Sequence, residues 1–499
     1  MLVDMKNWRE FFKGKKVTQM GLGLLGRGLR DADFLVRHGA EVLVTDLKSE
    51  KELTPSLKKL KKVCGYVIST SDVDITYPQA KIRFVLGKHK LEDFRNRDFI
   101  LKAAGVPLNS PYIAEARRNK IPIEMDASLF FKLMPDGVTF IGITGTRGKT
   151  TTAYLIYEII KRFLKVRPQT AKGGLTSSRP KVLLAGNIKD TATLPLLEKV
   201  RAGDFVVAEL DSWQLQGFGD SKISPHISVF TTFLPDHLNY YGGDMGKYFQ
   251  DKANIFKYQK NEDVFILGEQ ITRLNLKNEK GSTFKNLKSK KIVVRATDLP
   301  KNWKLKILGE YNRANAACAL AVARALKIPD GISRKAIENF GGVQGRLEFI
   351  REINGVKIYN DTCATTPDAT MAALRALNQV RFDETSNLTW KNKIILILGG
   401  SDKGLDMMEL VEEIPKYCKA VVLLPGTGTD KISSKFQVPS SKQLSITKVQ
   451  KLEEAIRRAI KISERGDTIL FSPAFASFGQ FVNEYDRGEQ FNEIVKKLA

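Results

Sequence analysis

One glycine-rich stretch contains the side chains best suited to phosphate chemistry. Residues 138–144 form an apolar run typical of a buried parallel strand, and they lead into Gly145-Thr146-Arg147-Gly148-Lys149-Thr150-Thr151. Glycines permit a tight turn that brings backbone N–H groups near phosphate oxygens, and a helix N-terminus adds positive potential. Lys149 would reach the β- and γ-phosphates, and the hydroxyl of Thr150 or Thr151 would hold Mg²⁺. The stretch therefore predicts a nucleoside-triphosphate site.

The surrounding sequence supplies the elements that such a site needs. A helix is expected after the loop, because apolar residues recur on one face, at Leu155, Ile156, Ile159, Ile160, Phe163 and Leu164. The strict spacing G-x-x-x-x-G-K-[ST] is missed, since Ile143 stands where the first glycine belongs. The alternative is a strand, turn and helix that contain Gly-Lys-Thr by chance.

Three more candidate groups follow in the next hundred residues. Residues 205–208 form an apolar run that ends at Glu209, and carboxylates at the ends of parallel strands are candidate Mg²⁺ ligands. A second run, residues 227–233, leads to Asp236 and His237, where a purely structural histidine is the alternative. Lys252 lies among apolar neighbours in an amphipathic segment, and by itself it indicates no function.

An earlier glycine motif predicts a second nucleotide-binding site. The apparent strand at residues 16–20 is followed by Gly21-Leu22-Gly23-Leu24-Leu25-Gly26, a helix pattern through His38, and a strand ending at Asp46. This order is typical of a nucleotide-diphosphate site. One alternative is a glycine turn needed only for close packing of helix and strand. Another is a nicotinamide oxidoreductase, but nothing else in the chain resembles a hydride site.

Length and composition set limits on the class of protein. A chain of 499 residues is too long for one hydrophobic core, so two to four domains are expected. No apolar run approaches the ~18 residues of a membrane span and no secretory leader is visible, so a cytoplasmic protein is expected. Four dispersed cysteines suit a reducing compartment and argue against a cysteine-built zinc site. The net charge of +25 allows a nucleic-acid-binding module. However, the lysines are not interleaved with aromatic residues, so solvated faces are the preferred interpretation and no specific nucleic acid is expected.

The alternation of strands and helices predicts an α/β protein of three doubly wound domains. We expect a Rossmann-like N-terminal domain over residues 1–126 and a central P-loop ATPase-like domain over residues 127–342. A C-terminal Rossmann-like domain is expected over residues 343–499.

The ordered set of motifs resembles the Mur ligase family, and within it the branch that joins D-glutamate to UDP-N-acetylmuramoyl-L-alanine. The similarity extends over nearly the whole chain. Besides the loop at residues 145–151, it is carried by Gly186-Asn187-Ile188, Glu209 to Leu215, Asp236-His237, Asp251-Lys252, Gly309 to Asn315, Gly345 to Glu348, Asn360-Asp361, Gly399 to Gly404 and Ser472 to Ser477.

This resemblance implies ATP-dependent formation of an amide bond during peptidoglycan precursor synthesis. The terminal carboxylate of UDP-N-acetylmuramoyl-L-alanine would attack the γ-phosphate to give an acyl phosphate, which the amine of D-glutamate would then attack. The expected partners are small molecules, namely these two substrates and ATP. The chain is expected to be a monomer and to have no membrane span.

The same resemblance assigns roles to individual residues. It implies catalytic roles for Lys149, Lys252, His237 and Glu209, and Mg²⁺ ligation, with two ions, by Thr150, Glu209, His237 and a carbamylated Lys252. ATP would be bound by Gly145, Thr146, Arg147, Gly148, Lys149, Thr150, Thr151, Asn312, Asn315, Arg346 and Asp361. The UDP-sugar would contact Gly21, Leu22, Gly23, Leu24, Asp46 and Asn187, and the amino acid would contact Thr365, Lys403 and Ser477.

Three departures from the family pattern concern substrate recognition. Cys363 stands where the family often has lysine, and Glu484 stands where it often has phenylalanine beside the glutamate. Ala103-Ala104-Gly105 replaces the more usual Ser-Pro-Gly. The first two leave the choice between D- and L-glutamate open. Another Mur-type ligase or a folylpolyglutamate-type ligase is the alternative within the same fold.

Overall fold

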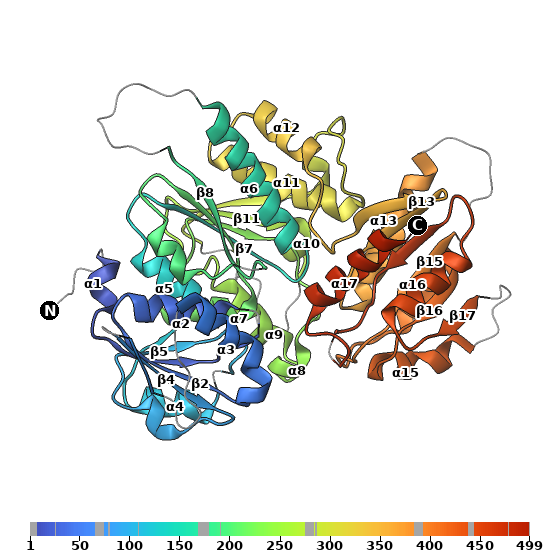
Figure 1. The fold of residues 1–499 in the computed structure, drawn as a ribbon. Helices are drawn as coiled ribbons and strands as arrows, with labels where there is room; N and C mark the ends of the chain where they lie inside the picture. The colour runs from blue at the N-terminus through green and yellow to red at the C-terminus, as the bar shows by residue number, and fades with distance from the viewer. Residues whose placement is uncertain are drawn as a thin grey trace. The chain divides into compact units, whose positions relative to one another are not determined.

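A computed structural model gives the fold of the chain (Figure 1). It describes residues 7–24, 26–64, 74–77, 80–107, 109–167, 179–189, 191–274, 284, 287–383, 393–437, 444–477 and 479–498. The chain divides into two compact units, the first comprising residues 1–295 and 318–333 and the second residues 296–317 and 334–499. Three six-stranded sheets form the framework of these units.

The first sheet has the strand order β3-β4-β2-β1-β5-β6 and is parallel except for the pair β3 and β4. Strand order reverses at β1, so the loops after β1 and β5 border the crevice where ligands of open α/β sheets bind. The strands are β1 (Lys16–Met20), β2 (Glu41–Asp46), β3 (Asp74–Tyr77), β4 (Ala80–Leu86), β5 (Phe99–Lys102) and β6 (Ile123–Glu124).

The second sheet has the order β12-β11-β10-β7-β9-β8, and all its pairs are parallel. The central strand β7 lies between β9 and β10, so the loops that follow these three strands leave the same edge of the sheet. The strands are β7 (Thr139–Thr144), β8 (Val182–Gly186), β9 (Phe205–Glu209), β10 (Ile227–Phe230), β11 (Val264–Gly268) and β12 (Lys290–Val294).

The third sheet has the order β13-β14-β18-β15-β16-β17, with an antiparallel pair only between β13 and β14. The loops after β14, β15 and β18 meet at one edge, because these strands are adjacent and parallel. The strands are β13 (Glu348–Ile353), β14 (Val356–Asn360), β15 (Ile394–Leu398), β16 (Cys418–Leu423), β17 (Ser445–Lys448) and β18 (Thr468–Phe471).

Helices connect the strands, as expected for parallel sheets. The helices are α1 (Trp8–Phe12), α2 (Arg27–Arg37), α3 (Glu50–Cys64), α4 (Pro111–Arg118), α5 (Asp126–Leu133), α6 (Lys149–Val166), α7 (Ser212–Asp220), α8 (Leu238–Tyr241), α9 (Met245–Ala253), α10 (Glu269–Thr272), α11 (Glu310–Ala325), α12 (Asp330–Asn339), α13 (Pro367–Asp383), α14 (Met408–Tyr417), α15 (Thr427–Ser433), α16 (Leu452–Lys461) and α17 (Glu484–Lys497). Short 3-10 turns are η1 (Leu91–Phe94), η2 (Leu194–Glu198), η3 (Ala296–Asp298) and η4 (Ser434–Gln437).

The first two sheets belong to one unit because their helices share a hydrophobic core. A single cluster of buried apolar residues runs from Trp8 in α1 to Ile271 in α10. Ion pairs reinforce the junction, since Glu198 of η2 accepts from Arg37 (2.5 Å) and lies 2.9 Å from the ring of His38.

These sheets confirm the predicted α/β fold class. Helix α6 also follows the glycine loop where the sequence pattern indicates it, and its residues Leu155, Ile156, Ile159 and Ile160 are buried. Among the described residues, no helix is both long and apolar enough to cross a membrane. The residue boundaries of the three predicted domains stay predictions.

Candidate functional site

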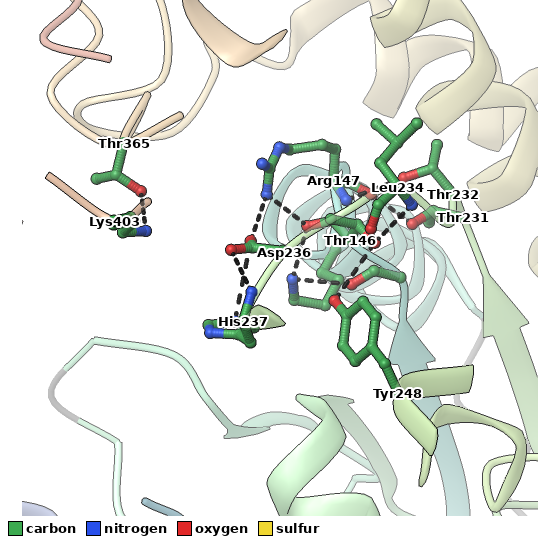
Figure 2. Close-up of polar contacts among 12 residues, drawn as sticks. Thr146, Arg147, Thr231, Thr232, Leu234, Asp236, His237, Tyr248, Thr365 and Lys403 are labelled. Atoms are coloured by element: carbon green, nitrogen blue, oxygen red, sulfur yellow. Dashed lines mark hydrogen bonds and ion pairs between the residues drawn. The ribbon is translucent and has the colours of Figure 1, made fainter. Parts of the chain in front are cut away.

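The glycine loop after β7 is held by the chain that follows β10 (Figure 2). Thr146 Oγ1 accepts from the backbone N–H of Leu234 at 2.9 Å and donates to the carbonyl of Leu234 at 3.1 Å. The backbone N–H of Arg147 donates to Thr232 Oγ1 at 2.9 Å. The chain after β10 thus fixes the loop through the backbone of Leu234 and the hydroxyl of Thr232.

Glycine is required at two points of this loop. Gly145 has a φ of +144°, and a Cβ there would lie 2.0 Å from Thr231 Oγ1. Gly148 adopts the left-handed conformation and caps the N-terminus of α6, where Lys149, Thr150 and Thr151 form the first turn. The positive φ angles and the close approach to Thr231 therefore explain why this turn contains glycines.

Acidic and hydroxyl oxygens converge beside the start of α6. Thr150 Oγ1 donates to Glu209 Oε2 at 2.6 Å, so the end of β9 lies against the loop as the sequence suggests. Glu209 is buried. Two of the four residues predicted to bind metal are thus in direct contact.

Asp236 joins the loop to His237 (Figure 2). Its Oδ2 accepts from Arg147 Nη1 at 2.9 Å, and its Oδ1 accepts from the backbone N–H of His237, also at 2.9 Å. His237 has a φ of +53°, which is uncommon for a residue with a side chain, and its ring packs 4.8 Å from that of Trp213. Sequence analysis did not single out the ion pair between Asp236 and Arg147.

Two lysines lie next to the same loop. Lys149 Nζ donates to the carbonyls of Gly145 and Thr146 at 3.0 and 3.1 Å. Lys252 Nζ, on α9, donates to the carbonyl of Gly145 at 3.0 Å and is 1% exposed. Burial and the nearby charge of Lys149 hold the pKa of Lys252 well below its ordinary value. Both effects shift the amine of Lys252 towards its neutral form, relative to an exposed lysine.

The oxygen donors suit Mg²⁺, which takes oxygen ligands and commonly shares its coordination with substrate phosphates. Glu209 supplies a buried carboxylate and Thr150 a hydroxyl at the N-terminus of α6. Within the described part of the chain, no group of three or more histidine, cysteine or acidic side chains could hold a metal by itself. The carboxylate of Glu209 and the hydroxyl of Thr150 therefore fit an ion that shares its coordination with a phosphate.

A cavity of about 730 Å³ lies at the crevice of the first sheet. It is bordered by the loop after β1, including Gly21 to Leu24, and by the loop after β5, including Ala103 to Pro107. Gly21 permits this approach, since a Cβ on it would lie 2.8 Å from that of Ala103. The cavity is large enough for a nucleotide-sized ligand.

Asp46 organises the glycine loop of this cavity. Its Oδ2 accepts from the backbone N–H groups of Leu22 (2.9 Å) and Gly23 (3.1 Å), and its Oδ1 accepts from that of Lys48 (2.9 Å). Two loop amides expected to face a ligand are thus bound to a carboxylate of the protein. The spacing of glycines and Asp46 did not indicate this arrangement.

Asn187 lies beside the same cavity, after β8. Its Oδ1 accepts from Nη2 of Arg27, a cavity-lining residue, at 2.7 Å. The turn before it requires Gly186, which has a φ of +77° and no room for a Cβ, because that atom would lie 2.0 Å from the carbonyl oxygen of Glu209. Sequence analysis missed Arg27, although its place directly after the glycine motif could have drawn attention to it.

In the second unit, the predicted amino-acid contacts are partly brought together. Lys403 Nζ donates to Thr365 Oγ1 at 3.0 Å (Figure 2). Ser477 is buried and follows Ala476, which exchanges two backbone hydrogen bonds with Ser401. The loops after β14, β15 and β18 therefore meet, and the role of these residues in binding the amino acid stays a prediction.

The predicted nucleotide contacts of the second unit form two groups. Asn315 Nδ2 donates to Asn312 Oδ1 at 2.9 Å, as expected for residues three apart on a helix. Asp361 accepts from the backbone N–H of Leu347 (2.9 Å) and from Ser472 Oγ (2.8 Å). Burial raises the pKa of Asp361 to about 7, against the lowering effect of these hydrogen bonds and of Arg346.

A buried arginine that sequence analysis missed supports the loop after β14. Arg487 is 1% exposed, and it donates to the side-chain and backbone oxygens of Thr362 at 3.1 and 2.8 Å and to the carbonyl of Phe475 at 3.2 Å. Burial lowers the pKa of Arg487 to about 10. Two ionisable neighbours, Glu484 and Cys363, act to raise the pKa of Arg487. They are two of the departures from the family pattern.

Comparison with known proteins gives the family. The pattern of the Mur ligase middle domain matches residues 143–323, and that of the Mur ligase glutamate ligase domain matches residues 345–475. A UDP-N-acetylmuramoylalanine–D-glutamate ligase of Roseiflexus sp. (strain RS-1) is 32% identical, and the alignment covers 97% of this chain and 99% of the relative. The chain belongs to the Mur ligase family. An enzyme of the same name from Clostridium kluyveri is also 32% identical, with 99% of each chain covered.

Solved structures of other Mur ligases share the fold. UDP-N-acetylmuramate–alanine ligase MurC of Thermotoga maritima has a TM-score of 0.56 at 20% identity and covers 97% of this chain and 99% of its own. MurF of Acinetobacter baumannii has a TM-score of 0.54 at 14% identity and covers 98% of this chain and 92% of its own. Membership of a ligase family decides against the oxidoreductase.

Proposed function

We propose that this Mur ligase joins D-glutamate to UDP-N-acetylmuramoyl-L-alanine and converts ATP to ADP and phosphate in the process. The observation that carries the proposal is similarity over nearly the full length to relatives of that name, together with the geometry around Glu209 and the glycine loop. The reaction belongs to peptidoglycan precursor synthesis.

In the first step, the carboxylate of the UDP-sugar attacks the γ-phosphorus of ATP. The bond between the γ-phosphorus and the bridging oxygen breaks, and the products are an acyl phosphate and ADP. The backbone of the loop at residues 145–148 and the Lys149 ammonium stabilise the charge on the transferring phosphoryl group. Arg147 lies in the same loop, where Asp236 holds its guanidinium in an ion pair.

Thr150, Glu209 and His237 would hold Mg²⁺, which supplies charge neutralisation for the phosphate oxygens when bound. Addition of CO₂ to the Lys252 amine would form an N–C bond and release one proton from the nitrogen. The resulting N-carboxylate would be an anionic oxygen ligand. The burial of Lys252 against the carbonyl of Gly145 supports this role, since a permanently charged ammonium is costly there. A second Mg²⁺ is part of the proposal.

In the second step, the amine of glutamate attacks the acyl carbon, and phosphate leaves. Lys403, Thr365 and Ser477 would hold the glutamate, because an ammonium and two hydroxyls suit a side-chain carboxylate. The contact between Lys403 and Thr365 supports their acting on one ligand. Asn312, Asn315, Arg346 and Asp361 would contact the nucleotide, and Asn187, Asp46 and Gly21 to Leu24 the UDP-sugar.

The experiment that tests this function is phosphate release from ATP with purified protein. Release should require both UDP-N-acetylmuramoyl-L-alanine and D-glutamate, and mass spectrometry should find the ligated product. Release that depends on neither compound contradicts the proposal.

L-glutamate is the second candidate for the amino acid, because Cys363 and Glu484 alter the side chains near Arg487 and the loop after β14. The same assay with L-glutamate, meso-diaminopimelate or tetrahydrofolate separates the alternatives. Product from L-glutamate and none from D-glutamate would establish the alternative stereochemistry.

A further inference from the structure

The cavity of the first sheet is rich in carboxyl groups, although its expected ligand is an anion. Asp31, Asp46 and Asp126 all line it. Asp46 also takes the backbone N–H groups of Leu22 and Gly23, two donors that a diphosphate would otherwise use. A nucleoside diphosphate bound here needs positive charge from another source.

Lys48, Lys102 and Arg27 are basic residues that line the cavity, and they differ in their surroundings. Lys102 is 2% exposed, and its Nζ donates to the carbonyls of Val106 (2.7 Å), Ala103 (3.3 Å) and Ala104 (3.4 Å). Its ammonium therefore serves the protein's own loop. Lys48 is exposed and lies two residues beyond Asp46, the carboxyl end of β2.

Arg27 occupies a different place, between the glycine loop and Asn187. It is the first residue of α2, directly after Gly26, and is partly buried in the cavity wall. Its Nη2 donates to Asn187 Oδ1 at 2.7 Å, a contact that uses one of the five N–H donors of a guanidinium. A planar guanidinium beside a helix N-terminus suits bidentate contact with phosphate oxygens.

We propose that Arg27 is the residue that binds the diphosphate of the UDP-sugar, with Asn187 fixing the orientation of its guanidinium. This inference rests on the proposed function, since it names a contact of the same substrate. It assigns to Arg27 the charge recognition that the amides of Leu22 and Gly23 cannot give while they are bound to Asp46.

The charges around Arg27 agree with this role. Burial and the neighbouring Asp126 raise the pKa of Asp31 well above its ordinary value, and burial also raises the pKa of Asp126. Both carboxyls are thereby shifted towards their neutral forms, although the charge of Arg27 lowers the pKa of each. Asp31 Oδ1 is buried and makes no hydrogen bond within the described structure.

The test is calorimetric binding of UDP and of uridine to the full chain, for the wild type and for Arg27→Gln and Arg27→Lys. Arg27→Gln should weaken UDP binding about tenfold or more and leave uridine binding within about twofold, because only the charged contact is lost. Arg27→Lys should retain part of the preference for UDP. Arg30→Gln is the matched control, since Arg30 is exposed on the same helix and does not line the cavity.

Steady-state kinetics supply a readout that misfolding would not imitate. Arg27→Gln should raise the KM for the UDP-sugar about tenfold, with the KM for ATP and kcat nearly unchanged. If the wild type prefers UDP to uridine and Arg27→Gln keeps that preference, the role of Arg27 is wrong while the proposed function stands. If the wild type shows no preference for UDP, both the site and the proposed function are contradicted.

Discussion

At the scale of single residues, the most unusual group is the buried amine of Lys252. It lies against the carbonyl of Gly145 and close enough to Lys149 for the two charges to repel each other. A lysine in such a place is costly as an ammonium and useful as a carbamate. We therefore propose that this side chain, once carbamylated, is a source of negative charge.

We predict that Lys252→Ala lowers kcat about a hundredfold or more, because the variant loses an anionic ligand beside the transferring phosphate. Acetate or formate should restore part of the activity by replacing the missing carboxylate. Lys247→Ala is the control, since Lys247 is exposed on the same helix α9. An alanine variant at position 252 with normal activity would exclude the carbamate.

Asp361 provides a pH-dependent prediction. Its pKa is raised to about 7 in the folded protein, above the value of 3.8 for a free aspartate, so the folded state binds the proton more tightly. Its contribution to stability is full below the lower value and is lost as the pH rises to the higher one. Asp361→Asn keeps an acceptor for the N–H of Leu347 and does not titrate.

The wild type should therefore lose stability relative to Asp361→Asn between about pH 4 and about pH 7, the interval between the two pKa values. The measurement is the midpoint of thermal unfolding of both proteins across this range. A difference between them that stays constant with pH would show that Asp361 does not titrate in this way.

At the scale of elements, the turn after β8 shows how a backbone conformation places a side chain. Gly186 is left-handed and tightly enclosed by the carbonyl of Glu209, and the N–H of Asn187 donates to that same carbonyl at 2.7 Å. The end of β9 thus fixes both the Glu209 side chain and the position of Asn187. One turn connects the phosphate loop with the cavity of the first sheet.

We predict that Gly186→Ala destabilises the protein by about 1–3 kcal/mol and raises the KM for the UDP-sugar, because the turn must move and Asn187 with it. Gly203→Ala is a matched control: Gly203 has a φ of +86°, but no atom lies within 4 Å of an added Cβ. Gly203→Ala should lower the stability of the protein and leave the KM for the UDP-sugar unchanged. Equal effects of both variants on the KM would contradict the role of the turn.

At the scale of the whole molecule, the sequence was most informative where local patterns determine structure. The loop at residues 145–151 and the spacing of Asn312 and Asn315 follow from strand, turn and helix rules, and the structure places them as expected. The pairing of Asp236 with Arg147 and of Arg27 with Asn187 could not be predicted in this way. Such contacts join residues 89 and 160 positions apart, and only the arrangement of neighbouring strands and helices brings them together.

The central claim is that the molecule activates a carboxylate with the γ-phosphate of ATP. It is tested most directly with UDP-N-acetylmuramoyl-L-alanine labelled with ¹⁸O in its terminal carboxylate, in the presence of ATP and glutamate. We predict that each phosphate released carries one labelled oxygen, because the oxygen that bridges carbon and phosphorus in the acyl phosphate leaves with the phosphate when the amine attacks. Unlabelled phosphate, with both labelled oxygens retained in the sugar substrate, would mean that water attacks ATP and would contradict the account.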